Sequence, residues 1–146
     1  MSAFEVHRIP GDGALEDAFE VRRSVFVEGQ DVPEEIEMDG EDEDAVHFVI
    51  RDSEAEQPVG TARLRPPKDK VAKPERVAVL AEYRGNGLGR KLMRLIEAEA
   101  RTQGYMHSCL HAQTHVVDFY EGLGYEVVSE EFEEAGIPHV EMEKTL

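Results

Sequence analysis

Apolar and polar positions alternate in a regular way along the N-terminal part of the chain. Phe4, Val6 and Ile9 indicate a short strand, which ends at the turn residues 10–13. Over residues 14–27 the apolar positions follow the spacing of a helix. Residues 28–44 combine glycine, proline and a dense run of acids, so we expect an irregular segment there that could hold one helical turn.

The middle of the chain has the pattern of strands. Residues 45–51 and 59–64 predict two strands, which the polar segment 52–58 joins as a hairpin loop. Residues 66–70, Pro-Pro-Lys-Asp-Lys, predict a break. A further strand of small and β-branched residues is expected at 76–80.

The C-terminal half begins with a long amphipathic helix. Over residues 87–103 the apolar positions form one stripe, and Gly104 is the natural residue to end this helix. We then expect a strand at 106–112 and a short helix at 115–123. Two closing strands follow at 125–129 and 139–143, separated by a loop that contains residues 136–138. The order β-α-β-β-β-α-β-α-β-β, without repeats or a linker, predicts one α/β (α+β) domain over residues 1–146, with helices packed on a mixed sheet.

The charge narrows the choice of partners. The 32 acidic residues outnumber the 16 Lys and Arg residues, which gives a formal net charge of −16. Such a surface repels nucleic acid and anionic membranes, because binding to both depends on Lys and Arg. With no apolar run long enough to span a bilayer and no signal-peptide pattern at the N-terminus, we expect a cytoplasmic protein. Adaptation to a high-salt cytoplasm is one hypothesis for the acidity.

Two local features have a structural and a functional interpretation. Residues 33–44 hold eight carboxylates in twelve positions, which could attract a cationic amine or form a solvated acidic loop, and we favour the loop. Cys109 is the single cysteine, so no intramolecular disulfide is possible. We interpret it as a small buried residue rather than a reactive thiol.

The strongest local signal lies at the start of the long helix. A buried strand leads through a turn with Gly85, Gly87 and Gly89 directly into the helix. Glycine allows close approach of a ligand, and the unpaired amides of a first helical turn favour an anion. Arg84 and Arg90 add positive charge in an acidic chain, so we predict a phosphate ligand, the alternative being a glycine-rich turn without one. The dinucleotide fingerprint and the P-loop motif do not fit.

Two motifs resemble those of one family. Residues 84–89, Arg-Gly-Asn-Gly-Leu-Gly, resemble the Arg/Gln-x-x-Gly-x-Gly/Ala signature of the GNAT acetyltransferase superfamily. Downstream, Phe119-Tyr120 followed by Gly124-Tyr125 resembles the family's second motif. Residues 23–28, 110–113 and 136–139, together with Asp39 and His47, look like the ElaA-like branch, from whose pattern Gly29 departs.

The resemblance implies the GNAT fold, a mixed central sheet of six to seven strands flanked by about four helices. In it the fourth and fifth strands splay apart, and the pantetheine arm of acetyl-CoA lies between them. Backbone groups of Val77, Ala78 and Val79 would contact the pantetheine. The pyrophosphate would be held by Arg84 and by the amides of the residues that follow it, namely Gly85, Asn86, Gly87, Leu88, Gly89 and Arg90.

The implied reaction is direct attack of a neutral amine on the thioester. A primary amine has a pKa of about 10.4 and must lose a proton before it attacks. The backbone amide near Val79 would stabilise the oxyanion. Tyr120 matches the tyrosine that protonates the departing thiolate, its alternative role being that of a core aromatic.

Several residues are candidates for the general base and for the acceptor site. Glu75 could act through water or be a solvated acid at a strand end. His111 and His139 are candidates for a proton relay and for the acceptor site, or have structural roles. Asp39 and His47 could shape the acceptor pocket or hold the loop by hydrogen bonds. We expect no metal, because the chain lacks a His-Glu-x-x-His pair.

Three classes of function are thus distinguished. The first is an acetyl-CoA-dependent N-acetyltransferase that acts on a small-molecule or peptide amine. The second is a non-catalytic module that senses acetyl-CoA, and the third is a protein-interaction module that uses the acidic segment. The chain could also form a homodimer, which the sequence does not decide.

Overall fold

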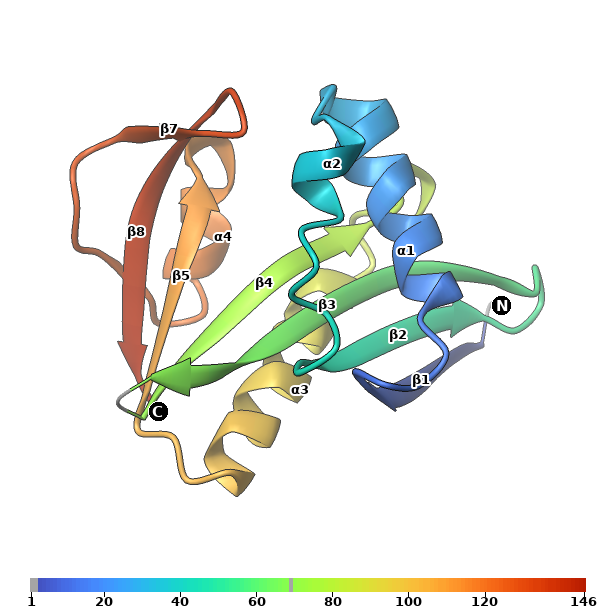
Figure 1. Cartoon of the computed structure of the whole chain (residues 1–146), viewed down its shortest axis with the longest axis horizontal. Helices are drawn as coiled ribbons and strands as arrows, with labels where there is room; N and C mark the ends of the chain where they lie inside the picture. Colours follow the sequence, from blue (N-terminus) through green and yellow to red (C-terminus); the bar gives the residue numbers. More distant parts are fainter. Residues whose placement is uncertain (1–2, 69) are drawn as a thin grey trace.

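One sheet of eight strands organises the protein, which a computed structural model describes for residues 3–68 and 70–146. The strands follow the order β1-β2-β3-β4-β5-β8-β6, and β7 pairs with β8 (Figure 1). Their bounds are β1 Phe4–Pro10, β2 Val46–Asp52, β3 Gln57–Lys68, β4 Val71–Val79, β5 His107–Gln113, β6 Glu126–Val127, β7 Phe132–Glu134 and β8 Ile137–Thr145.

Helices cover both faces of this sheet. They are α1 Glu16–Arg22, the π-helical turn η1 Arg23–Glu28, α2 Glu34–Glu37, α3 Leu88–Thr102 and α4 Val117–Glu121, with short 3-10 turns η2 Ala81–Tyr83 and η3 Thr114–Val116. Figure 1 shows α1 and α2 in front of the sheet and α3 behind it. The predicted mixed sheet with about four helices is confirmed, although it has eight strands rather than six or seven.

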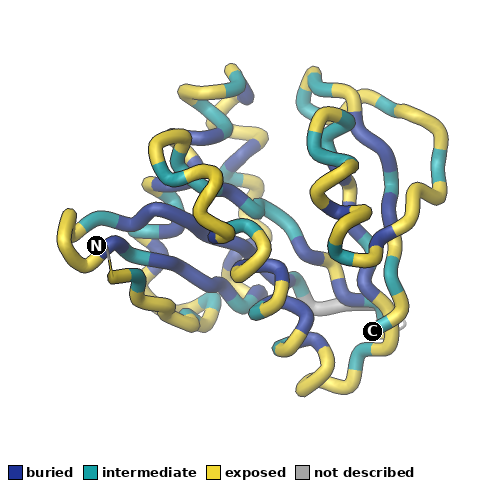
Figure 2. The backbone as a smooth tube through the Cα atoms, turned by 180° about the vertical axis from the view of Figure 1, so that it is seen from behind, coloured by how far each residue is buried: buried dark blue, intermediate teal, exposed yellow. Residues whose placement is uncertain are grey.

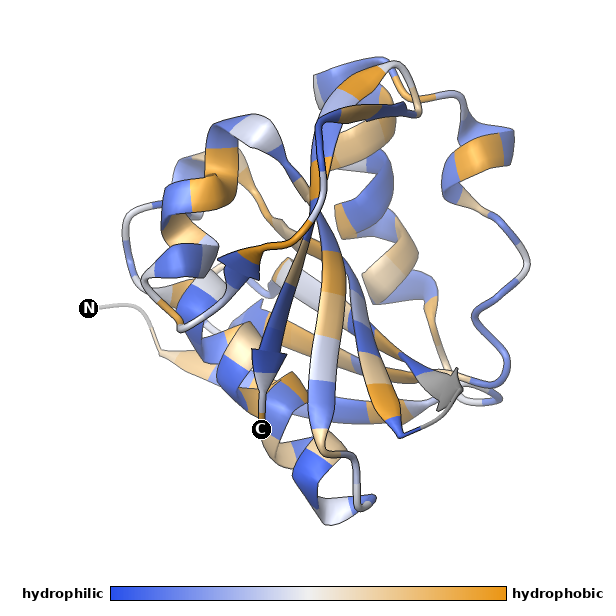
Figure 3. Cartoon of the chain, turned by 90° about the vertical axis from the view of Figure 1, so that its left-hand side faces the viewer, coloured by the Kyte–Doolittle hydropathy of each residue, from blue (hydrophilic) through white to orange (hydrophobic). Residues whose placement is uncertain are grey.

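The apolar stripe of α3 explains why this helix forms where it does. Leu88, Leu92, Ile96 and Ala100 are buried against residues of β2, β3 and β4. A second core lies between α4, β5 and β8, and a smaller one joins α1 to Ala78 of β4. Figure 2 shows β2 and most of β3 buried and the outer sides of the helices exposed, and Figure 3 shows apolar and polar residues mixed along each helix.

The strands β4 and β5 run parallel but pair over only two positions, Val71 with His107 and Ala72 with Ser108. The other paired strands of the sheet are antiparallel. Beyond Ala72, β4 and β5 diverge like the arms of a V, as Figure 1 shows. The predicted splay of the fourth and fifth strands is therefore confirmed.

Two predictions about the strands were wrong in part. The break expected over residues 66–70 is shorter, because β3 continues to Lys68 and β4 begins at Val71 rather than at residue 76. The pairing register shifts between Arg65 and Lys68, and such an irregularity allows proline within a strand. Residue 69 lies outside the described residues.

The second error concerns β7, which falls in a segment predicted as a loop. The strand has only three residues, too few for a recognisable alternation. It pairs with β8 through a two-residue turn in which both Ala135 (φ 53°) and Gly136 (φ 77°) have positive φ.

Within the described residues, no helix has the length and apolar character needed to cross a membrane.

Candidate functional site

A cavity of about 700 Å³ opens where β4 and β5 diverge. Both strands line it, together with residues of η1, α2, α4 and the turn between β7 and β8. Its size is typical of a site for a small-molecule ligand. We call this cavity the cleft.

The strand β4 is bulged where it faces the cleft. Thr61 of β3 pairs with Ala78 and Arg63 pairs with Glu75, so Arg76 and Val77 stand opposite the single residue Ala62. Arg76 has a φ of 56°, a left-handed conformation that is rare for a residue with a side chain. The bulge turns the backbone of β4 and leaves some of its peptide groups without a partner on β3.

The N-terminus of α3 lies at the end of β4 and is open. Gly87 caps this helix in the left-handed conformation (φ 76°), and no side chain accepts hydrogen bonds from the first amides. A Cβ atom built on Gly85 or Gly87 would meet no atom within 4 Å. These glycines therefore leave exposed helix amides beside free space, an arrangement that suits an anion.

The other residues of the predicted phosphate site have different surroundings. The guanidinium Nε of Arg84 donates a hydrogen bond of 3.1 Å to the carbonyl of Val79, and Arg84 lines the cleft. Asn86 donates a hydrogen bond to the carbonyl of Tyr83, which closes the turn. Leu88 is buried, whereas Arg90 is exposed.

Gly89 lies close to α4. A Cβ atom at this position would lie 3.2 Å from Cζ of Phe119 on α4. The cleft lining thus includes Val77, Ala78, Val79 and Arg84, while residues 85–90 lie beyond the lining, directly after Arg84.

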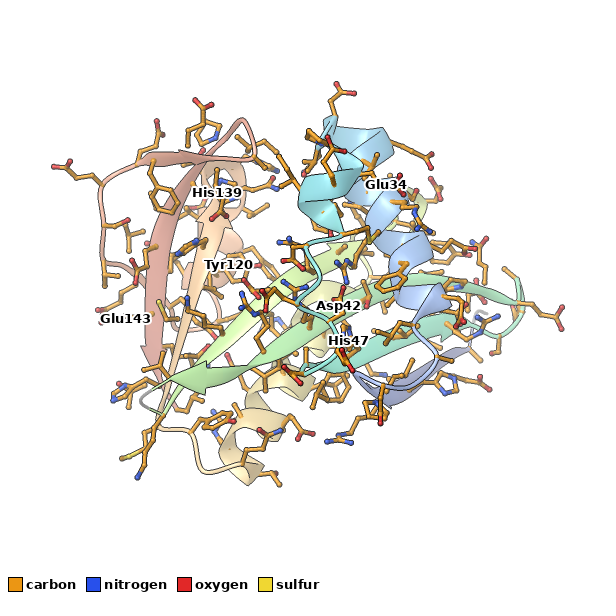
Figure 4. All side chains as sticks on the ribbon, viewed as in Figure 1. Glu34, Asp42, His47, Tyr120, His139 and Glu143 are labelled. Carbon is orange, nitrogen blue, oxygen red and sulfur yellow. The ribbon has the colours of Figure 1, made fainter. Side chains whose placement is uncertain are left out.

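Tyr120 of α4 lines the opposite wall. Its ring packs edge-on against Phe119 and Tyr125, and 9% of the residue is exposed. Figure 4 shows Tyr120 beside β5, on the side that faces β4. Burial raises the pKa of the Tyr120 hydroxyl to about 12, because the charged phenolate would be poorly solvated. The Tyr120 hydroxyl is therefore protonated at neutral pH.

Glu75 of β4 also lines the cleft, but its carboxylate is already engaged. Its Oε1 accepts a hydrogen bond of 3.0 Å from the buried guanidinium of Arg63 and a longer one from Arg65. Both hydrogen bonds fix the Glu75 carboxylate against β3.

His111 and His139 meet across neighbouring strands. His111 of β5 contacts Oε1 of Glu134 through Nδ1, over 2.9 Å. His139 of β8 donates through Nδ1 to the carbonyl of Ile137, and its Nε2 lies 3.6 Å from Oε2 of the same Glu134. The structure thus brings both predicted histidines together on one wall of the cleft, around a carboxylate that the sequence did not indicate.

The acidic segment is held against the sheet by arginines. Glu37 and Asp42 are 3% and 8% exposed, and both are paired with Arg22, which is itself buried. Asp39 is paired with Arg63 and Arg76 and lines the cleft. For Glu37 and Asp42 the interpretation as a solvated loop was wrong, because long-range ion pairs hold them in the interior. Asp39 is paired but stays exposed. The other acids of this segment are exposed.

These pairs change the pKa of the aspartates. Burial alone would raise the pKa of Asp39, but the hydrogen bonds from Arg63 and from the backbone amide of Glu41 hold it well below its ordinary value. The pKa of Asp42 is lowered in the same way, burial being outweighed by Arg22 and Arg63. Both aspartates are therefore ionised at neutral pH.

His47 lies on β2 and outside the cleft lining. It is fully buried, its Nε2 lies 3.0 Å from the carbonyl of Asp42, and burial lowers its pKa. Figure 4 shows it beside Asp42. Of the two roles considered, this position fits the holding of the loop rather than the shaping of the pocket.

Three further residues line the cleft, namely Gln30, Cys109 and Gln113. Cys109 is half-buried rather than buried, and burial together with a hydrogen bond to Glu141 raises its pKa to about 12, which disfavours a reactive thiolate. Gln30 and Gln113, 83 residues apart, exchange two hydrogen bonds of 3.0 and 2.9 Å. No local pattern in the sequence could have revealed that pair.

Among the described residues, no group of three His, Cys, Asp or Glu side chains could hold a metal ion.

Comparison with known proteins yields consistent matches. The model of the acetyltransferase (GNAT) domain matches residues 14–146. The uncharacterized N-acetyltransferase YjcF of Bacillus subtilis is 45% identical over 131 residues, which cover 89% of this chain and 91% of that protein.

Solved structures share the fold. Escherichia coli ElaA superposes with a TM-score of 0.86 at 26% identity and covers 97% of this chain and 99% of its own. The PaiA N-acetyltransferase of Thermoplasma acidophilum, solved in complex with coenzyme A, superposes with a TM-score of 0.76 at 17% identity and covers 99% of each chain. At that identity the second likeness concerns the fold alone.

Proposed function

Because this chain belongs to the GNAT acetyltransferase family, we propose that it transfers the acetyl group of acetyl-CoA to a primary amine by direct attack. The observation that carries the proposal is the continuity of the site. The cleft between β4 and β5 leads from Tyr120, past the bulge of β4, to Arg84 beside the open N-terminus of α3.

The donor fits this arrangement by its chemistry. The diphosphate of coenzyme A would accept hydrogen bonds from the amides of residues 85–90, where Gly85 and Gly87 leave room for it, and Arg84 and Arg90 would add positive charge. Backbone groups of Val77, Ala78 and Val79 line the cleft and would contact the pantetheine arm. The complex of the Thermoplasma PaiA protein with coenzyme A supports the choice of donor.

The reaction needs a stabilised oxyanion and a protonated leaving group. An amide of β4 near Val79 would donate to the oxyanion as the amine attacks the thioester carbon. Tyr120, whose raised pKa keeps it protonated, would donate its proton to the sulfur of coenzyme A. The same tyrosine regains a proton from solvent before the next turnover.

The base accepts the proton that the amine loses. His111 is the better candidate for this base, because it is exposed and lines the cleft. Its Nδ1 contacts Glu134, so its Nε2 is the ring atom that would accept the proton. Glu75 is the alternative, weakened by its hydrogen bonds to Arg63 and Arg65. Asp39 and His139 would border the acceptor, a small-molecule or peptide amine, whereas His47 lies too deep to do so.

The test follows coenzyme A through binding and turnover. The purified protein is titrated with coenzyme A by calorimetry and then incubated with acetyl-CoA and a panel of polyamines and peptide amines, while thiol release is recorded. We expect binding, and thiol release that depends on one class of amine. Binding without turnover would favour the acetyl-CoA sensor, and the absence of both binding and a thermal shift would favour the interaction module.

A further inference from the structure

The wall of the cleft formed by β5, β7 and β8 contains a carboxylate shared by two imidazoles. Glu134 directs Oε1 to Nδ1 of His111, over 2.9 Å, and Oε2 towards Nε2 of His139, over 3.6 Å. All three residues line the cleft. The arrangement depends on the turn at Ala135 and Gly136, which brings Glu134 of β7 opposite Ile137 of β8.

The contacts of His111 fix the position of its proton. A carboxylate only accepts hydrogen bonds, so the hydrogen of His111 lies on Nδ1, and Nε2 of the neutral ring carries the lone pair. The ring is further held by Phe132, whose centroid lies 5.1 Å away in an edge-on contact. Nε2 is thereby left as the ring atom available to a proton from the cleft.

The charge of Glu134 acts on the protonated form. When Nε2 of His111 takes a proton, the ring becomes an imidazolium, and a carboxylate at hydrogen-bond distance stabilises that charge. His139 donates through Nδ1 to the carbonyl of Ile137, so Nε2 of its neutral ring carries a lone pair and lies 3.6 Å from Oε2 of Glu134 without a hydrogen bond. Among the other titratable groups on these strands, Cys109 lines the cleft, and Glu141 is paired in register with His111 across β5 and β8.

We propose that Glu134 is a positioning residue for catalysis, which orients His111 as the general base and stabilises its imidazolium. The inference rests on the proposed function. The amine N–H bond breaks as Nε2 of His111 accepts the proton, the N–C bond to the acetyl carbon forms, and the C–S bond breaks as Tyr120 protonates the sulfur. His111 then releases the proton from Nε2 to solvent through the cleft, which restores the ring with its hydrogen on Nδ1 facing Glu134.

The first test measures the tautomer of the His111 ring directly and needs no amine acceptor. The tautomer of His111 is measured by long-range proton–nitrogen NMR at about pH 8, above the ordinary histidine pKa of about 6.5. We expect the proton on Nδ1 in the wild-type protein. In Glu134→Ala it should shift towards Nε2, the form that free imidazole side chains favour in water. Glu133→Gln, an exposed carboxylate on the same strand, is the matched control and should leave the tautomer unchanged.

The second test is a double-mutant cycle on kcat, with acetyl-CoA and the amine that gives the fastest thiol release. Glu134→Ala should lower kcat about tenfold, part of what general base catalysis supplies, with little change in KM. In a His111→Ala background the same substitution should change kcat less than about twofold, because Glu134 acts through His111. A purely structural role would lower kcat equally in both backgrounds.

The outcomes separate the two proposals. An unchanged His111 tautomer in Glu134→Ala, or equal losses of kcat in both backgrounds, would overturn the role of Glu134 and leave the acetyltransferase proposal standing. A wild-type protein that binds coenzyme A but releases no thiol with any amine would overturn both the proposed function and the catalytic role of this wall.

Discussion

The buried guanidinium of Arg63 donates a hydrogen bond of 2.9 Å to Oδ1 of Asp42, an oxygen that also accepts a bond from Arg22. One carboxylate thus serves two arginines that are each 1% exposed. Arg22 and Arg63 tie the acidic segment to α1 and to β3. Arg63 also donates a hydrogen bond to Asp39, which is thereby held at the cleft. The negative charge of residue 42 therefore supports the side of the cleft that Asp39 lines.

We expect Asp42→Asn to lower the free energy of unfolding by about 3 kcal/mol, because the substitution removes the buried carboxylate that pairs with both Arg22 and Arg63. Urea unfolding measures the effect. Asp44→Asn removes the same charge from an exposed neighbour and should change the stability by less than about 0.5 kcal/mol. Equal stability of the two variants would contradict the structural role of the Arg22–Asp42–Arg63 cluster.

The buried His47 makes the protein sensitive to mild acid. Burial lowers its pKa in the folded state, so the unfolded chain binds a proton more readily. Its contribution to stability is complete above the unfolded pKa of about 6.5 and is lost as the pH falls towards the lower folded pKa. The loss cannot exceed about 1.4 kcal/mol per pH unit for one group.

The contribution of His47 is isolated by comparison with His47→Gln across pH 8 to 5. The wild-type stability should fall more steeply than that of the variant below about pH 6.5. The pKa values of Asp39 and Asp42 are also lowered in the folded state, so both residues also stabilise the fold less as the pH falls. This loss begins only below about pH 3.9, the ordinary pKa of an aspartate. Burial raises the pKa of Glu37, which therefore opposes the trend in both proteins alike. Parallel curves would show that His47 is not linked to folding.

The open N-terminus of α3 predicts the effect of charge at Gly87. Gly87→Glu would place a carboxylate beside the amides that are proposed to hold the diphosphate, and we expect the Kd for coenzyme A to rise more than about a hundredfold. Asparagine tolerates the left-handed conformation, so Gly87→Asn is the matched neutral control and should change the Kd less than about tenfold. Calorimetry measures both. Similar Kd values for the two variants would contradict a diphosphate at this position.

The features that the sequence predicted are local ones. The stripe of α3 and the glycine-rich turn before it are defined by neighbouring residues, so Leu92 and Gly87 could be placed without knowledge of the fold. The splay of β4 and β5 was reached through the family resemblance. Its physical basis, pairing over only Val71–Ala72, is a property of the assembled sheet.

The features that were missed depend on contacts between distant parts of the chain. Arg22 and Asp42 are 20 residues apart, and nothing in the acidic segment shows which of its carboxylates an arginine will bury. His111 and Glu134 are 23 residues apart and meet only because a three-residue strand pairs with β8. The glycine pattern assigned Gly89 to the approach of a ligand. Its contact with Phe119 was not predicted, because Phe119 lies on another helix.

Tyr120 provides a test of the chemical step that is separate from binding. Tyr120→Phe keeps the ring that packs against Phe119 and Tyr125 but removes the proton donor. We expect kcat to fall roughly a hundredfold, the lower end of what a general acid contributes, and the Kd for coenzyme A to stay within about twofold. The melting temperature of the variant controls for folding.

The raised pKa of Tyr120 adds a prediction about pH. An acid is active while it is protonated, so a tyrosine with its pKa at about 12 should support turnover to higher pH than an ordinary tyrosine, whose pKa is about 10. In the wild-type enzyme kcat should therefore not decline between about pH 8 and pH 10 through loss of this proton. A decline over that range that is absent from the residual activity of Tyr120→Phe would show that the hydroxyl ionises in the cleft, and a variant with unaltered kcat would remove Tyr120 from the mechanism.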